Sequence, residues 1–265
     1  MYQVAAHIMD QRSDSMNMIK IEIPLEPMQK YLNEKRAEGK RISHLALVIA
    51  AFVRTVAEYP LLNRFIANKC IYARNELAIG MVVLKPGELE GTMNKMYFER
   101  TNTIFEVQEI LDNYVSQNRE KGDTNKTDDL IRLLLSIPGL CRFGANLLKW
   151  ADKHGLLPKS IIQASPFHCS MTITNLASIR TNYIYHHVYN FGTTTMLMAL
   201  GNAVEVPRRK HGEIVHEKCI PVGVVMDERI CSGSLYAAAF KRMEQYYKDP
   251  SLLEVPPEKV VEDIR

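Results

Sequence analysis

The sequence predicts an α/β protein, because strand patterns and helix patterns follow one another along its 265 residues. Residues 18–23 alternate apolar and charged side chains, which is typical of a half-buried strand. Residues 45–56 present a broad apolar face, with Ser43 placed to cap a helix and Pro60 placed to end it. The two patterns mix without the regular alternation of a βαβ array, so α/β and α+β arrangements both fit.

The same periodicities and the turn residues predict the remaining elements. Thr103 and Glu106 have the spacing of a capping box, which indicates that a helix starts there. The basic run at 208–210 is expected in a solvated turn, and the polar stretch 119–127 in a loop. The other predicted elements are a helix over 28–38, strands at 69–74 and 76–84 joined as a hairpin at 74–75, strands at 92–99, 169–175, 193–200 and 219–226, and a final helix from Ser234 to just before Pro250.

The composition is that of an ordinary folded protein, with 46% hydrophobic and 24% charged residues. A net charge of +3, without a basic run interleaved with aromatics, does not indicate a nucleic-acid partner. No apolar run reaches the roughly 18 residues needed to span a bilayer, and the N-terminus lacks the pattern of a secretory signal. We therefore expect a cytoplasmic protein.

The five cysteines are scattered, form no CxxC pair and are odd in number, which argues for reduced thiols rather than a disulfide framework. The neighbouring pairs His168-Cys169 and His186-His187 do not suit a metal site, because adjacent residues of a strand point to opposite faces. We expect no metal. The cysteines are Cys70, Cys141, Cys169, Cys219 and Cys231.

Four short motifs occur in order along the chain. They are Arg-Ser-Asp-Ser at 12–15, Glu-Tyr-Pro-Leu-Leu-Asn at 58–63, Met-Thr-Ile-Thr-Asn-Leu at 171–176 and Asp-Glu-Arg-Ile-Cys-Ser-Gly at 227–233. The last three look like the E-Y-P-x-L-N, F-T-I-S-N-L and D-H-R-x-x-D-G motifs of the 2-oxo acid dehydrogenase acyltransferases. Their joint order over 5–250, outside 129–162, resembles the catalytic domain of that family, within the chloramphenicol acetyltransferase-like superfamily.

This resemblance implies a two-layer α/β fold, with a large mixed sheet and helices on one side. It implies a single acyltransferase-like domain over 1–265, with a helical insertion at about 129–162. It also implies a homotrimer in which each active site lies between neighbouring subunits.

The resemblance further implies roles for individual residues. In the family, a histidine takes the proton from a thiol or hydroxyl acceptor, which attacks the thioester of an acyl-CoA, and a hydroxyl residue stabilises the oxyanion. By position Thr174 is that hydroxyl, and Glu228 stands in place of the histidine. Asn175, Ser232 (in place of the motif's aspartate) and Gly233 are expected beside the substrate. A coenzyme A thioester is then the co-substrate, and a small molecule is the acyl acceptor.

The sequence leaves more than one base available. A carboxylate is a weaker base than imidazole by about 2 pKa units. Glu228 therefore needs an apolar pocket that makes it a stronger base. The positive charge of Arg229 opposes the effect of that pocket if the Arg229 side chain turns toward the carboxylate. His186 or His187 is the alternative base. Cys231 is expected to be a small buried hydrophobe rather than a nucleophile.

Two functions follow from these residues. The retained hydroxyl favours an acyl-CoA-dependent acyltransferase with an unusual base. The simultaneous loss of the motif's histidine and aspartate favours a catalytically inactive trimeric pseudoenzyme that binds ligands or serves as a scaffold. Whether the chain is an enzyme is left open by the sequence.

The pattern of residues 129–162 predicts two or three short amphipathic helices. They carry many large apolar side chains, including Phe143 and the single tryptophan, Trp150. Three roles fit such an insertion. It packs on its own subunit or across an oligomer interface, it covers an acyl chain, or it makes contact with a membrane surface.

Overall fold

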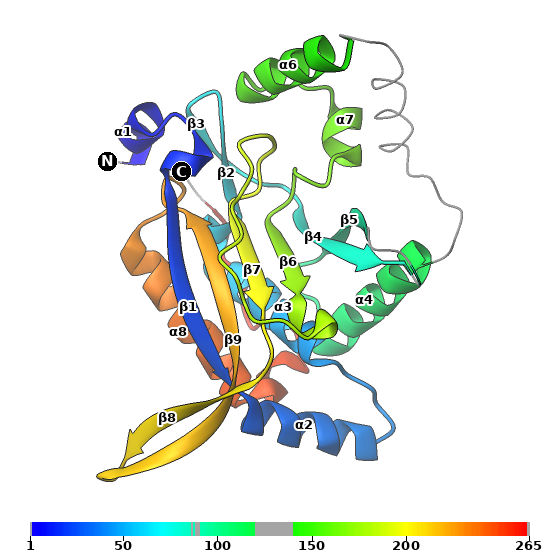
Figure 1. The fold of residues 1–265 in the computed structure, drawn as a ribbon, viewed down its shortest axis with the longest axis vertical. Helices are drawn as coiled ribbons and strands as arrows, with labels where there is room; N and C mark the ends of the chain where they lie inside the picture. The colour runs from blue at the N-terminus through cyan, green and yellow to red at the C-terminus, as the bar shows by residue number, and fades with distance from the viewer. Residues whose placement is uncertain (1, 86, 88–90, 120–139, 264–265) are drawn as a thin grey trace.

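The protein, seen in a computed structural model, is built on one large mixed sheet (Figure 1). The structure describes residues 2–85, 87, 91–119 and 140–263. The β4–β6 and β6–β7 pairs are parallel and the other pairs are antiparallel. In spatial order the strands are β1 (Met16–Pro24), β9 (Glu213–Asp227), β7 (Met196–Leu200), β6 (Met171–Asn175), β4 (Leu77–Leu84) and β5 (Gly91–Phe98), with β8 (Val204–Lys210) paired to one end of β9.

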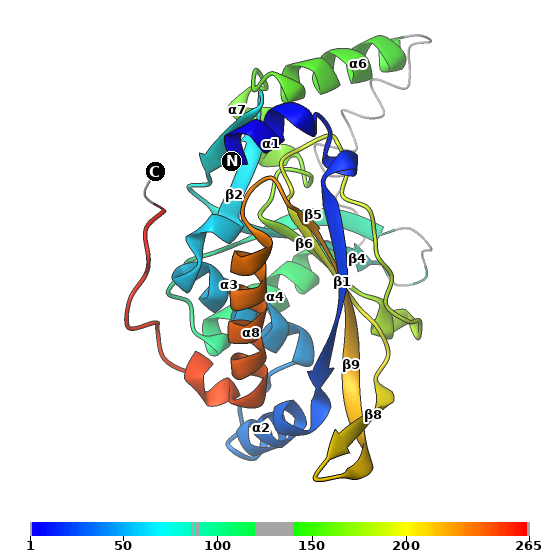
Figure 2. The same cartoon turned by 90° about the vertical axis from the view of Figure 1, so that its left-hand side faces the viewer.

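Four long helices cover one face of this sheet and form the second layer (Figure 2). Helix α3 is buried on nearly all sides, which explains why its sequence is apolar almost throughout. This arrangement confirms the predicted α/β class with a mixed sheet and helices on one side. The four helices are α2 (Leu25–Ala37), α3 (His44–Glu58), α4 (Ile104–Arg119) and α8 (Gly233–Lys248).

The smaller elements lie around this two-layer body. None of the described helices combines the length and apolar character that crossing a bilayer requires. Of the predicted insertion, residues 129–139 lie outside the described part, and 140–162 form two helices. The smaller elements are α1 (Tyr2–Ile8), α6 (Leu140–Lys153), α7 (Lys159–Ala164), the two-stranded sheet of β2 (Arg64–Ala67) and β3 (Cys70–Ala73), and the 3-10 helices η1 (Arg12–Asp14), η2 (Pro60–Asn63), η3 (Leu176–Ile179) and η4 (Pro250–Leu253).

The caps predicted from local sequence are present. The Ser43 hydroxyl accepts a hydrogen bond from the backbone N–H of Ala46 at the start of α3. The Glu106 carboxylate accepts from the backbone N–H of Thr103 at 2.7 Å, which completes the capping box of α4. These contacts satisfy N–H groups that a helix start leaves without partners, so both helices begin where the sequence predicts.

Two local predictions are wrong. The predicted hairpin over 69–84 does not form, because β2 and β3 pair around a turn at Asn68 and Lys69, which have positive φ angles of 46° and 60°, and β4 joins the main sheet. The basic run 208–210 belongs to strand β8, and the turn follows at His211 and Gly212.

Candidate active site

A groove with a volume of about 580 Å³ lies along β4, β6 and β7, beside the segment that connects β6 to β7. This segment crosses the sheet on the face opposite the four helices, and Gly223 of β9 lets it approach closely: a Cβ atom there would lie 2.2 Å from the carbonyl oxygen of Ile184. Val188 is buried against the sheet with Leu197 and Val225. The segment therefore forms a fixed wall of the groove.

The lining of the groove is mainly apolar, with a few hydroxyl groups, one side-chain amide (Asn175), one imidazole and one guanidinium (Arg119). Thr172 and Thr174 contribute hydroxyls from β6, and His186 contributes a ring from the crossing segment. Such a cavity suits a small ligand with a large apolar part. The main apolar lining residues are Met81, Val82, Leu84, Met93, Phe167, Val188 and Leu197.

Glu228 does not line this groove, and it lies at the other end of the strands from Thr174. Thr174 is level with Ala199 on β7, whereas the residue before Glu228 donates its N–H to the carbonyl oxygen of Thr195. Gly223 of β9 is level with Thr174, so five residues along the strand and two strand spacings separate Glu228 from Thr174, roughly 19 Å. A single chain cannot bring this carboxylate and this hydroxyl to the same substrate atom.

Glu228 is half-buried at the end of β9. Its carboxylate accepts a hydrogen bond from the Asn17 side-chain amide at 2.7 Å, and its backbone N–H donates to the carbonyl oxygen of Ser15 at 2.9 Å. These contacts come from Ser15, just before β1, and from Asn17 of β1, which is the edge strand beside β9. Glu228 therefore lies at the edge of the sheet. Asn17 is polar, so this contact does not provide the apolar pocket that a carboxylate needs to act as a base.

The neighbouring Asp227 is buried and ion-paired. Its carboxylate accepts hydrogen bonds from Arg229 at 2.7 and 2.9 Å and from the Ser15 hydroxyl at 2.9 Å. A second guanidinium, that of Arg12, lies 3.7 Å away, and donates to the carbonyl oxygens of Tyr189 and Gly192. Burial lowers the pKa of Arg12, and the Asp227 carboxylate opposes that shift. Arg229 therefore turns away from Glu228.

The other residues of the fourth motif have structural contacts. Ser232 caps α8, since its hydroxyl accepts a hydrogen bond from the N–H of Leu235, and it also contacts the Ser234 hydroxyl at 2.8 Å. Gly233 is exposed at the first turn of this helix. Burial raises the pKa of the Cys231 thiol to about 12, so this thiol is protonated at neutral pH and is a poor nucleophile.

The two candidate histidines are not equivalent. His186 lines the groove together with Thr174 and Asn175, whereas His187 is exposed and does not. The rings stack at 4.8 Å, and Nδ1 of His186 lies 2.9 Å from the carbonyl oxygen of His187. Of the predicted site residues, the fold thus brings Thr174, Asn175 and His186 together. Across the described ranges, no cluster of three or more histidine, cysteine or acidic side chains could hold a metal ion.

The structure also contains a buried polar connection that the sequence did not reveal. Asp152 of α6 accepts a hydrogen bond from the backbone N–H of Gly192 at 2.6 Å, and its other oxygen lies 2.9 Å from Nε2 of His168. The Ser165 hydroxyl lies 2.8 Å from Nδ1 of the same ring. The one visible signal was an aspartate on a helix side that otherwise carries small and apolar residues.

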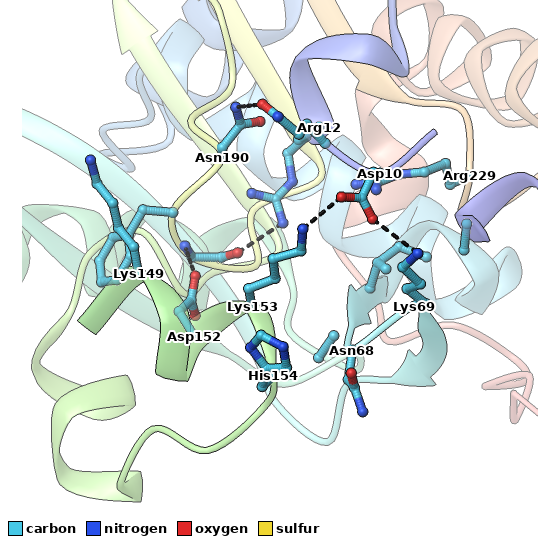
Figure 3. Close-up of a pocket in the computed structure, with 16 residues that line it drawn as sticks. Asp10, Arg12, Asn68, Lys69, Lys149, Asp152, Lys153, His154, Asn190 and Arg229 are labelled. Atoms are coloured by element: carbon cyan, nitrogen blue, oxygen red, sulfur yellow. Dashed lines mark hydrogen bonds and ion pairs between the residues drawn. The ribbon is translucent and has the colours of Figure 1, made fainter. Parts of the chain in front are cut away.

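A polar cavity of about 390 Å³ lies beside this connection (Figure 3). Asp10 pairs there with Lys153 of α6 at 2.6 Å and with Lys69 of the β2–β3 turn at 3.3 Å. Asp10 and Asp152 together attach the end of α6 to the body of the molecule.

Replacing Asp152 with alanine is expected to loosen α6. The change leaves the His168 ring and the Gly192 N–H without their partner in a buried place, which costs about 1–3 kcal/mol. Chemical denaturation measures the loss, and limited proteolysis within 140–164 should become faster. Lys149→Ala, on the same helix, should change neither; equal effects of the two substitutions would contradict the assignment.

No protein-family model and no curated protein matches the sequence. Solved structures do match. The chain is similar to a probable dihydrolipoamide acetyltransferase from Listeria monocytogenes, with 14% identity and a TM-score of 0.60, covering 92% of this chain and 91% of that chain. It is similar to a truncated catalytic core of the 2-oxoacid dehydrogenase multienzyme complex from Thermoplasma acidophilum, with 13% identity and a TM-score of 0.57, covering 94% and 97%. A third match is a chloramphenicol acetyltransferase, with 12% identity and a TM-score of 0.54, covering 93% and 95%.

The chain has the chloramphenicol acetyltransferase-like fold. This result confirms the fold predicted from the order of the four motifs. Identities of 12–14% establish the fold alone, because one fold hosts many activities. In this acetyltransferase-like fold the third motif forms β6, on the groove, and the fourth runs from the last residue of β9 through the turn to the first residue of α8.

Proposed function

We propose that the protein is an acyltransferase that moves an acyl group from a coenzyme A thioester to a thiol or hydroxyl acceptor, in a homotrimer. The observation that carries the proposal is the Thr174 hydroxyl inside a mainly apolar groove of an acyltransferase-like fold. The separation of Thr174 from Glu228 within one chain supports a site shared between two subunits, with the hydroxyl from one and the carboxylate from the other.

The reaction divides the work between these two side chains. The Glu228 carboxylate takes the proton from the acceptor's S–H or O–H group, and the freed electron pair attacks the thioester carbonyl carbon. The Thr174 hydroxyl donates a hydrogen bond to the oxyanion of the tetrahedral intermediate. The intermediate then expels the coenzyme A thiolate, which takes the proton back from Glu228. No charge is left over at the end.

Glu228 becomes a suitable base only if water is removed from it. In the single chain it is half-exposed beside Asn17. Covering by a neighbouring subunit would disfavour the charged carboxylate and so make it a stronger proton acceptor. His186, which lines the groove with Thr174, is the second candidate base.

Thr174→Val is the substitution that tests the oxyanion role. Loss of one oxyanion donor is expected to lower kcat by about 10²- to 10³-fold. Thr172→Val is the matched control, because Thr172 lies on the same strand and lines the same groove. Release of free coenzyme A thiol from a series of acyl-CoA donors measures the rate. Equal losses for both variants would contradict the role, and Thr174→Ser should retain activity.

A ligand-binding protein without catalysis is the second candidate. It is favoured by the hydrogen bond that already holds Glu228 to Asn17 and by the absence of the motif's histidine and aspartate. Under this alternative, coenzyme A or an acyl-CoA binds the trimer without turnover, and Glu228→Gln leaves that binding unchanged.

A further inference from the structure

Helix α6 carries an apolar stripe that faces away from the rest of the molecule. Phe143, Leu147 and Trp150 stand at positions i, i+4 and i+7, which places them on one helix face. Their exposed fractions are 67%, 52% and 54%. Figures 1 and 2 show α6 at the outer end of the molecule, beyond the sheet. Three large apolar side chains in one exposed row indicate a surface that binds something.

The opposite side of α6 is fixed to the body of the protein. Asp152 lies about half a turn around the helix from the stripe, and it is held by the Gly192 N–H and the His168 ring. Asn68 adds a backbone hydrogen bond to the carbonyl oxygen of Lys153, at the end of the helix. These contacts set the rotation of α6 about its axis, so the stripe is held outward.

The charges around the stripe are almost all positive. Residues 140–164 contain four lysines and arginines and a single acidic residue, Asp152, which is turned inward. Arg142 and Lys149 are seven residues apart, so they flank the same side of the stripe. Both are exposed, and neither has a carboxylate partner within the part of the chain that the structure describes.

We propose that α6 binds an anionic membrane surface. The helix lies flat, with Phe143, Leu147 and Trp150 in the boundary between headgroups and acyl chains. Arg142 and Lys149 then meet the lipid phosphates. An apolar surface of a second copy would cover the stripe but leave these two cations without counter-charge, whereas an anionic bilayer satisfies both. The inference does not depend on the proposed acyl transfer.

The single tryptophan of the chain makes this binding directly measurable, because Trp150 lies in the stripe. The full chain is titrated with vesicles of phosphatidylcholine, with and without phosphatidylglycerol. We expect the Trp150 emission to shift to shorter wavelength, and the protein to sediment, with the anionic vesicles only. Added salt should weaken the binding.

Two double variants separate the apolar contribution from the charge contribution. Phe143→Ser with Leu147→Ser should weaken partitioning by about 10- to 100-fold. Arg142→Gln with Lys149→Gln should weaken binding to anionic vesicles by about 30-fold and leave binding to neutral vesicles unchanged. The control is Ile214→Ser, which removes a side chain that is 71% exposed on β9 and should leave binding unchanged.

Three results would overturn the proposal. The first is no emission shift with anionic vesicles, and the second is equal binding to neutral and anionic vesicles. The third is a wild-type protein that does not bind vesicles but forms an oligomer, which is lost in the Phe143→Ser, Leu147→Ser double variant. That result would assign the stripe to a contact between copies of this chain. Sedimentation velocity on the same variants detects that outcome.

Discussion

Asp227→Ala is expected to lower the free energy of unfolding by about 3–5 kcal/mol, because it leaves two buried guanidinium groups without their carboxylate. Arg229 makes two hydrogen bonds to that carboxylate, and Arg12 lies 3.7 Å from it. The Ser15 hydroxyl loses its acceptor as well. Urea denaturation followed by circular dichroism measures the change.

The adjacent residue provides the matched control for this prediction. Glu228 is half-buried and accepts one side-chain hydrogen bond, from Asn17. Glu228→Gln should therefore change stability by no more than about 0.5 kcal/mol. A stability loss of similar size in both variants would show that Asp227 does not have the structural role assigned to it.

Glu228→Gln should instead lower the rate of acyl transfer by about 10²- to 10⁴-fold, the usual contribution of a general base. Glutamine keeps the size of the side chain and a carbonyl oxygen for the Asn17 hydrogen bond, but it cannot take a proton. Release of free coenzyme A under saturating donor and acceptor gives kcat for the variant and the wild type.

His186→Ala and His187→Ala identify the base if it is not Glu228. His186 lines the groove and His187 does not. A full rate in Glu228→Gln combined with a large loss in His186→Ala would move the proton transfer to the imidazole. The corresponding loss in His187→Ala should be small in either case.

Those parts of the fold that depend on neighbouring residues were predictable from the sequence. The caps at Ser43 and at Thr103 with Glu106 form from residues three apart, so local pattern is sufficient to place α3 and α4. The turn at Asn68 and Lys69 was not predictable in this way, because it contains no glycine although both residues have positive φ. Strand β8 was missed because its basic end has the composition of a loop. The β8–β9 ribbon projects from the body of the molecule (Figure 1), and the residues of β8 are exposed or half-exposed.

The candidate site was predictable only in its residue types. The motif positions placed Thr174 on a strand and Glu228 after another, but the distance between them depends on the order of three strands, which no local pattern contains. The Asp152–His168 contact joins residues 16 apart that belong to different local elements. Contacts of this kind follow from tertiary packing, so the role of Asp152 could not be predicted from the sequence.

Mixing two inactive variants tests the shared site most directly. Glu228→Gln subunits and Thr174→Val subunits are unfolded together, refolded together and assayed for acyl transfer. If the site is completed between neighbours, random assembly in equal amounts restores about a quarter of the wild-type activity, because that share of interfaces contains both intact side chains. The wild-type protein, refolded in the same way, has to be active in this assay. A mixture that is then no more active than either variant alone would contradict the shared site.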